Sequence, residues 1–275
     1  MNSEGLSERI HKIAADAGIG TIAVAVHDYQ DGTSFELDGE RWLHAASVIK
    51  LAVLMALFKS VEQGAFHLDD PLHVRNRFKS IADGSIYHLE PDRDGDGECH
   101  GRIGRTLKIG ELARAMIVRS SNLATNLLLD LLGIEQIQQT LASAGIKGVR
   151  LVRGVEDLAA FDRGLYNQMT AHGAVELLRL VCEGSFLNAG SREQILSILF
   201  AQEFNAMLPA KLPRDVRVAH KTGEISTHSH DAGIVYCTGR APYVIAIFSE
   251  SAAASDPRSR AVALISSLIF SRLTA

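Results

Sequence analysis

Strand signals at both ends of the chain, with helical signals between them, constrain the fold of these 275 residues more than any other feature. β-Branched residues bounded by turn signals indicate strands at 21–27, 33–37, 216–220, 233–237 and 243–249. Apolar residues at helical spacing indicate helices at 6–17, 47–63, 109–118, 121–132, 134–144, 170–182, 191–200 and 255–273. Because the strands come from both termini, we expect one sheet assembled from the two ends, with a helical domain inserted between them.

Composition and charge exclude several classes of protein. Hydrophobic residues make up 47% of the chain and charged residues 22%, which is typical of a compact soluble fold and excludes a disordered chain. The net charge of −4 provides no field that would gather a polyanion, so we expect no nucleic-acid partner. The most apolar run, at 51–58, is about eight residues, whereas a membrane span needs about 20, so we expect no span.

The strongest chemical signal lies in the apolar segment 45–58. Its helix is apolar on all sides and should be buried, yet it carries Lys50 in its first turn. Burial lowers the pKa of an ammonium group, which makes the neutral amine available as a base. Ser47 lies on the same helix face, near free N–H groups that suit an oxyanion. The pair indicates a serine nucleophile with its base; the alternative is that Ser47 caps the helix and Lys50 extends to the surface.

Two further motifs favour the first interpretation. Ser120-Ser121-Asn122 falls between two expected helices, and Lys221-Thr222-Gly223 ends an expected strand near the C-terminus. SxxK, SxN and KTG in this order are the signature of active-site serine β-lactamases and penicillin-binding proteins. In length, N-terminal helix and hairpin, and C-terminal helix, the chain most resembles class A β-lactamases, with Ser121 where that family has aspartate.

This resemblance implies a fold and a domain organisation. The implied fold is α/β plus all-α: an antiparallel sheet built from both termini and flanked by helices, with an inserted helical domain. The α/β domain would comprise residues 1–43 and 206–275, the all-helical domain residues 44–205, and the active site would lie at their interface.

The resemblance also implies roles for individual residues. Ser47 would be the nucleophile, Lys50 its base, and Ser120 the group that passes a proton to the departing nitrogen. The backbone N–H groups of Ser47 and Glu224 would form the oxyanion hole. If the Glu224 side chain faces the cleft, it would disfavour anionic substrates. The residues expected to bind substrate are Asn122, Lys221, Thr222, Gly223, Glu224 and Tyr87, the last as an aromatic at the cleft mouth or, alternatively, a half-buried loop tyrosine.

Deacylation is where the chain departs from the family. The stretch 150–157 begins like the family's Ω-loop pattern, but Glu156 comes one residue late, no proline follows it, and Ala160 stands where an asparagine helps to hold the hydrolytic water. Glu156 is therefore the candidate base for deacylation and Asp157 the fallback; the alternative is that both are solvated loop acids. If neither reaches the acyl carbonyl, the protein would be a D,D-peptidase or an esterase-like penicillin-binding protein with slow deacylation.

Three other features suggest metals or ligands more weakly. The segment 92–97 imitates the start of a calcium loop, but Ile103 stands where a bidentate glutamate is needed. His220, His228 and His230 form a cluster that could hold zinc, although we expect a turn and a pocket-lining histidine, with His230 as a possible partner for a substrate carboxylate. Widely spaced cysteines predict buried thiols rather than disulfides: Cys99, Cys182 and Cys237.

The expected partners follow from the resemblance. The substrate would be a β-lactam or a peptidoglycan stem, hydrolysed by a monomer without metal or cofactor. Because the N-terminus lacks a basic region followed by an apolar core, we expect no signal peptide in this sequence, although such enzymes work outside the cytoplasmic membrane. A third hypothesis is a silent binding module that keeps the fold and holds a cell-wall fragment or a metal.

Overall fold

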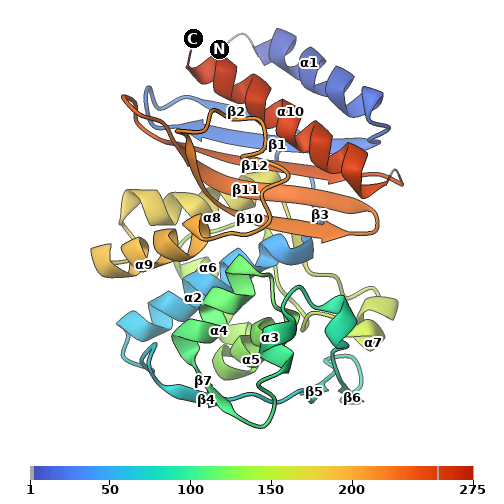
Figure 1. Ribbon diagram of the computed structural model, residues 1–275, viewed down its shortest axis with the longest axis vertical. Helices are drawn as coiled ribbons and strands as arrows, with labels where there is room; N and C mark the ends of the chain where they lie inside the picture. Colours follow the sequence, from blue (N-terminus) through green and yellow to red (C-terminus); the bar gives the residue numbers. More distant parts are fainter. Residues whose placement is uncertain (1–2, 253, 275) are drawn as a thin grey trace.

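A five-stranded antiparallel sheet joins the two ends of the chain in the computed structural model, which describes residues 3–252 and 254–274 (Figure 1). The strand order is β10-β11-β12-β1-β2. Pairing of β1 with β12, from Thr21 opposite Glu250 to Asp28 opposite Tyr243, connects the N-terminal hairpin to the C-terminal strands. The strands are β1 (Thr21–Asp28), β2 (Ser34–Leu37), β10 (Arg217–Ile225), β11 (His228–Tyr236) and β12 (Tyr243–Glu250). The prediction of one sheet from both termini is confirmed.

Helices cover both faces of this sheet (Figure 1). The terminal helices α1 (Ser3–Asp16) and α10 (Ser255–Leu273) pack on one face, and α8 (Ala171–Glu183) packs on the other. Successive residues of a strand point to opposite faces, so Val24 joins the core under α1 and α10 while Ala23 and Ala25 join the core under α8. Burial on both faces explains why β12 is apolar along nearly its whole length.

The inserted region is built around α2 (Lys50–Glu62), as its uniformly apolar sequence predicts. Residues 50–58 of this helix are all buried. The surrounding helices are α3 (Gly97–His100), α4 (Ile109–Val118), α5 (Asn122–Leu132), α6 (Ile134–Ser143), α7 (Leu158–Asp162) and α9 (Ala189–Phe200), with 3-10 turns η1 (Ala46–Ile49) and η2 (Pro91–Arg93). The region also holds short strands: β3 (Leu43–His44), β4 (Pro71–His73), β5 (Phe78–Lys79), β6 (Ile86–Tyr87), β7 (Thr106–Lys108), β8 (Val149–Arg150) and β9 (Gln168–Met169).

Several element boundaries differ from the expectation, the largest differences being in the strands: β10, expected at 216–220, continues to Ile225. Strand β11 begins at His228 rather than at 233, because its polar first half pairs with β10 through Ile225 opposite His228. The helix expected at 191 begins at Ala189, because the Asn188 side chain caps it by accepting the N–H of Ser191.

The cysteines are unpaired, with Cys99 buried and Cys182 and Cys237 partly buried. Within the described residues, no helix is long and apolar enough to cross a membrane.

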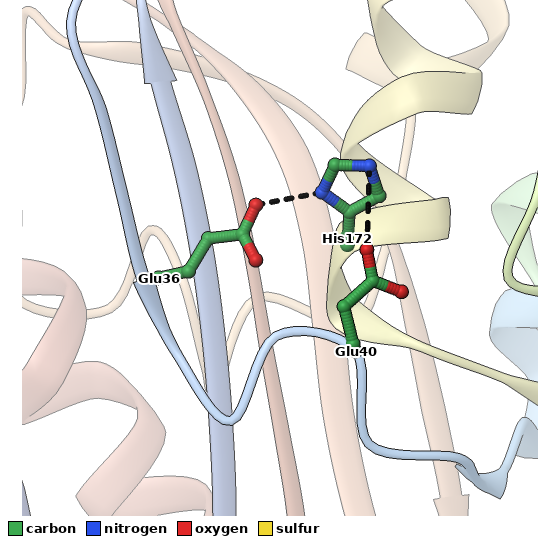
Figure 2. A group of neighbouring side chains, drawn as sticks. All are labelled: Glu36, Glu40 and His172. Carbon is green, nitrogen blue, oxygen red and sulfur yellow. Dashed lines mark hydrogen bonds and ion pairs between the residues drawn. The ribbon is translucent and has the colours of Figure 1, made fainter.

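An ion-pair bridge ties the edge strand β2 to the start of α8 (Figure 2). His172 Nδ1 lies 2.6 Å from Glu36 Oε1, and its Nε2 lies 3.8 Å from Glu40 Oε1. Burial lowers the pKa of His172, but the hydrogen bond and charge of Glu36 outweigh it and raise that pKa above its ordinary value. Among the described residues, Glu36, Glu40 and His172 are the acidic and histidine side chains whose ligand atoms lie close enough together to admit a metal ion. Each ring nitrogen faces a different carboxylate, so His172 bridges Glu36 and Glu40.

The burial of α2 generates a stability prediction. Leu54 is fully buried in this helix, so Leu54→Ala should lower the free energy of unfolding by about 2–5 kcal/mol. Leu264→Ala is the control, because Leu264 is 40% exposed on α10 and its truncation should cost well under half as much. Urea unfolding followed by circular dichroism measures both. Equal losses for the two variants would contradict the central position of α2.

Candidate active site

Ser47 lies in the 3-10 turn that leads into α2, directly against strand β10. The turn is entered through Ala46, whose φ of 44° is in the left-handed region. A Cβ on Gly223 would lie 3.0 Å from the Ser47 nitrogen and 2.9 Å from the Val48 nitrogen, so only glycine lets β10 approach this closely. The approach brings Ser47 and Glu224 to the wall of one cavity, as their backbone roles in an oxyanion hole require.

Lys50 is fully buried at the first position of α2 and is held by three acceptors. Its Nζ donates to the backbone oxygen of Ser120 at 2.7 Å, to Ser120 Oγ at 3.1 Å and to Asn122 Oδ1 at 2.8 Å. Burial lowers the pKa of Lys50 to about 7, although the charges of Asp94 and Glu156 act in the opposite direction. A substantial fraction of the amine is therefore neutral near pH 7 and able to take a proton.

Ser120 lies between the two lysines. Its Oγ accepts from Lys50 Nζ and from Lys221 Nζ, each at 3.1 Å. Lys221 is fully buried, and burial followed by the charge of Lys50 lowers its pKa well below the usual value. A serine hydroxyl has two acceptor positions and one proton. With both acceptor positions filled by the lysines, the Ser120 proton is free to be donated to another group.

Glu156 enters the site through Asn122. The Nδ2 of Asn122 donates to Glu156 Oε1 at 2.6 Å, while its Oδ1 accepts from Lys50. Glu156 adopts a left-handed φ of 59° and lines the same cavity as Ser47. Burial raises the pKa of its carboxyl, although the hydrogen bond from Asn122 opposes this. The loop acid that the sequence offers as the deacylation base therefore reaches the site.

Two cavities flank Ser47 and form one cleft. The first, about 370 Å³, lies under the Ω-loop, the segment 151–167 whose ends are joined by β8 and β9. The second, about 490 Å³, extends past Ser120 and Thr222 towards residues 203–207. Glu224 and Arg93 line both cavities. Glu224 therefore contributes to the cleft wall, and its side chain accepts at Oε1 from Ser255 Oγ at the start of α10.

Tyr87 does not stand at the cleft mouth. Its hydroxyl accepts from Asn126 Nδ2 at 3.2 Å, its ring packs against Phe78, and it lines a separate cavity behind the Ω-loop. The expected aromatic position is corrected on this ground, because Tyr87 supports the loop from the side away from Ser47. Arg93, which sequence reasoning missed, lines the cleft instead; no pattern in the sequence marks it.

Asp157, the fallback base, has a structural role. It is 1% exposed, and its Oδ1 caps α7 by accepting the N–H of Ala160 at 3.1 Å. Its Oδ2 accepts the N–H of Ile81 at 3.0 Å. Both carboxylate oxygens are therefore occupied by backbone donors away from Ser47, and Glu156 is the acid that the loop presents to the cleft.

His220 of β10 and His230 of β11 have structural roles as well. His230 is fully buried, donates from Nε2 to the backbone oxygen of His44 and accepts the N–H of Ser249 at Nδ1, so it cannot receive a substrate carboxylate. His220 binds Asp231 at 2.9 Å. Within residues 3–252 and 254–274 these histidines form no group spaced to hold a metal ion. His44, which no sequence motif marks, lines the cleft.

Comparison with known proteins places this fold and site in a class. The family model described as the Beta-lactamase enzyme family matches residues 5–273, so the chain belongs to that family and has the class A fold within the serine β-lactamase and penicillin-binding protein superfamily. It is 28% identical over 262 residues to the carbapenem-hydrolyzing β-lactamase KPC of Klebsiella oxytoca, covering 94% of this chain and 85% of that protein. It is 29% identical over 257 residues to β-lactamase AST-1 of Nocardia asteroides, covering 86% and 83%.

Solved structures agree with this assignment. An ancestral class A β-lactamase superposes with a TM-score of 0.83 at 28% identity, covering 97% of this chain and 99% of that one. The structure of PBP-A superposes with a TM-score of 0.83 at 23% identity, covering 98% of this chain and 96% of that one. At that identity, the second likeness shows the fold alone.

The burial of Lys50 generates a pH prediction. Only the neutral amine can accept the Ser47 proton, so the rate constant for acylation by benzylpenicillin should fall about tenfold per pH unit below about 7. Stopped-flow mixing with intact-mass detection measures this rate.

Lys50→Ala should slow acylation by several orders of magnitude, because a serine hydroxyl without a base is a poor nucleophile. Unchanged acylation at pH 7 in this variant would remove Lys50 from the mechanism.

Proposed function

We propose that the protein hydrolyses β-lactam rings through an acyl-enzyme on Ser47. The observation that carries this proposal is Ser120 Oγ, held 3.1 Å from both Lys50 Nζ and Lys221 Nζ in the cleft that Ser47 lines. This arrangement supplies a base for the nucleophile and a proton donor for the leaving nitrogen. In a β-lactam the amide nitrogen stays attached to the acyl group after the ring opens. Opening this ring needs both a base for the nucleophile and a proton donor for that nitrogen, so a β-lactam fits this site.

Acylation would proceed in three proton transfers. Ser47 Oγ attacks the carbonyl carbon while its proton passes to neutral Lys50, and the oxyanion is held by the N–H groups of Ser47 and Glu224. The carbon–nitrogen bond then breaks as Ser120 donates its proton to the nitrogen. The proton on Lys50 returns to Ser120 along their 3.1 Å hydrogen bond. The products are an ester on Ser47 and a secondary amine in the opened ring.

Deacylation would depend on Glu156. Its carboxylate takes a proton from water as the water oxygen adds to the ester carbonyl, and the collapsing intermediate releases Ser47 Oγ, which regains a proton. Asn122 Nδ2, 2.6 Å from Glu156 Oε1, fixes the carboxylate on the cleft side of the Ω-loop. The same amide holds Lys50 through Oδ1, so Asn122 connects the acylation base to the deacylation base.

One observation favours a second candidate, a D,D-peptidase or esterase-like penicillin-binding protein with slow deacylation. Glu156 is already engaged, with Oε1 bound to Asn122 and Oε2 3.9 Å from Arg93 Nε. A carboxylate occupied in this way is a weaker base for water. The two candidates share acylation on Ser47 and differ in the lifetime of the ester.

The nucleophile is tested by Ser47→Ala. This change removes one half-buried hydroxyl at the cleft, so the fold should persist while covalent labelling by benzylpenicillin is lost. Intact-mass spectrometry detects the adduct, and near-ultraviolet circular dichroism checks the fold. A Ser47→Ala protein that still gains the mass of penicillin would show that another residue is the nucleophile.

The role of Glu156 is tested by separating the two chemical steps. Glu156→Gln should acylate at a rate close to that of the native protein, accumulate the acyl-enzyme and lower steady-state turnover of nitrocefin by about 100-fold or more, because the water loses its base. Glu90→Gln is the matched control, since Glu90 is an exposed glutamate just before η2. Deacylation of Glu156→Gln at the native rate would favour the peptidase candidate.

A further inference from the structure

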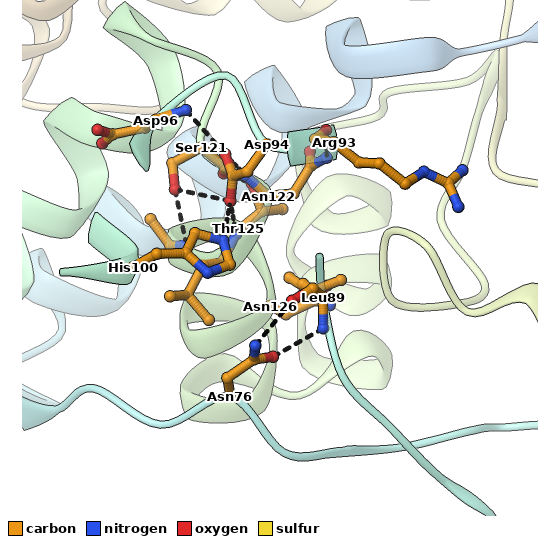
Figure 3. A network of polar contacts seen from close by, with 12 residues as sticks. Asn76, Leu89, Arg93, Asp94, Asp96, His100, Ser121, Asn122, Thr125 and Asn126 are labelled. Atoms are coloured by element: carbon orange, nitrogen blue, oxygen red, sulfur yellow. Dashed lines mark hydrogen bonds and ion pairs between the residues drawn. The ribbon is translucent and has the colours of Figure 1, made fainter. Parts of the chain in front are cut away.

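The acidic segment 92–97, which resembles part of a calcium loop in sequence, lies on the catalytic Ser-x-Asn motif (Figure 3). Asp94 Oδ1 accepts the N–H of Asn122 at 2.9 Å, and its Oδ2 accepts the N–H of Leu123 at 2.8 Å. These are N–H groups of the first turn of α5, which have no partner within the helix. A buried carboxylate from a distant loop therefore caps the helix that carries Asn122.

The remaining contacts fix the Asp94 carboxylate in this place. Its Oδ1 also accepts the N–H of Asp96 at 3.0 Å, and its Oδ2 lies 3.0 Å from His100 Nε2. The side chain of Asp94 is fully shielded from solvent. Because both oxygens already receive protein donors, the segment is not arranged as a calcium site, and the resemblance to a calcium loop has a different cause.

The Ser-x-Asn motif lacks the carboxylate that the family has at its middle position, and this explains why a carboxylate from a second loop is needed. Position 121, between Ser120 and Asn122, is serine where the family motif has aspartate, and Ser121 Oγ caps the N–H of Ala124, at 3.2 Å. Ser121 Oγ lies 3.5 Å from Asp94 Oδ2. The carboxylate of Asp94 thus occupies the space beside the residue that lacks one.

The same segment also holds the residue on the other side of Ser120. A Cβ on Gly95 would lie 2.3 Å from the backbone oxygen of Arg119, so only glycine allows this contact. Asp96, 2% exposed, forms an ion pair of 3.0 Å with Arg119 Nε. Ser120 itself has a left-handed φ of 58°, a conformation that persists only where the surroundings impose it. The segment therefore holds the backbone on both sides of Ser120.

We propose that Asp94 is a positioning residue for proton transfer, supplying from the 92–97 segment the carboxylate that position 121 lacks. The proposal rests on the proposed function, because Ser120 and Asn122 are the groups it aligns. All three acceptors of Lys50 belong to these two residues, so a shift of the start of α5 would move the base and the proton donor together.

The test compares two substitutions that remove the same charge from the same segment. In Asp94→Asn the amide nitrogen faces a backbone N–H donor, so one N–H at the start of α5 loses its acceptor. In Asp92→Asn the changed side chain is exposed. Asp94→Asn should lower the acylation rate constant at saturating benzylpenicillin by about tenfold to 100-fold, since a misplacement of about 1 Å costs about that much. Asp92→Asn should stay within about twofold of native. A lower melting temperature with native acylation by Asp94→Asn would overturn the proposal.

Moving the carboxylate provides the rescue. Ser121→Asp alone places a second carboxylate beside Asp94 and should slow acylation, whereas Ser121→Asp in the Asp94→Asn chain should restore at least about tenfold of the lost rate. Independent effects of the two substitutions, with no rescue, would overturn the proposal. This pair of variants also decides the matter if Asp94→Asn alone does not fold, because the double variant keeps one carboxylate at the helix start.

An activity-independent measurement separates this proposal from the proposed function. Hydrogen exchange of the peptide containing Asn122 and Leu123 should be faster in Asp94→Asn than in native protein and unchanged in Asp92→Asn. A native chain that forms no adduct with benzylpenicillin would refute the proposed function and leave this result standing. Unchanged exchange in Asp94→Asn would refute the positioning role, whatever the activity.

Discussion

The burial of the Lys50 amine is the constraint on which the rest of the site depends. An ammonium group removed from water is costly unless acceptors replace its hydration, and in this protein the acceptors come from one short segment, residues 120–122. That requirement fixes the start of α5 against α2, and it fixes Ser120 next to a second buried amine on β10. Burial lowers the pKa of both amines, and the charge of Lys50 lowers that of Lys221 further. The arrangement that satisfies a buried charge thus also brings the pKa of Lys50 to about 7, where this amine can exchange protons.

Helix α5, whose start binds Lys50, also binds the Ω-loop. Asn122 and Asn126 are four residues apart and so lie on one face of the helix. Asn126 holds the loop backbone through both groups of Val155, accepting its N–H at 2.8 Å and donating to its oxygen at 3.0 Å, and Asn122 holds the carboxylate of the next residue. The loop is thus attached to the same helix face that receives Lys50, so Glu156 and Lys50, the proposed bases for deacylation and acylation, share one support.

The sequence predicts the sheet from both termini, the buried α2 and the three motifs, because periodicity, burial and short spacing are local properties. It predicts less where a residue's role depends on distant contacts. Nothing near Tyr87 indicates that Asn126 turns it away from the cleft, and nothing near Asp94 indicates that α5 lies beside it. The polar first half of β11 has no apolar alternation, and its burial comes from neighbouring elements. The domain boundaries and the monomeric state stay predictions.

The late position of Glu156 shows how a one-residue change in spacing is absorbed. Against the family pattern the loop has one residue more before the glutamate, which in a regular extended chain would turn the side chain away. Two local features counter this. A Cβ on Gly154 would lie 2.2 Å from Tyr87 Oη and 3.2 Å from Asn126 Oδ1 of α5, so glycine allows the backbone to approach both side chains, and Glu156 adopts a left-handed φ rather than an extended one. The carboxylate therefore reaches Asn122 by a different backbone path, and the role proposed for Glu156 depends on geometry that a motif search over spacing alone does not detect.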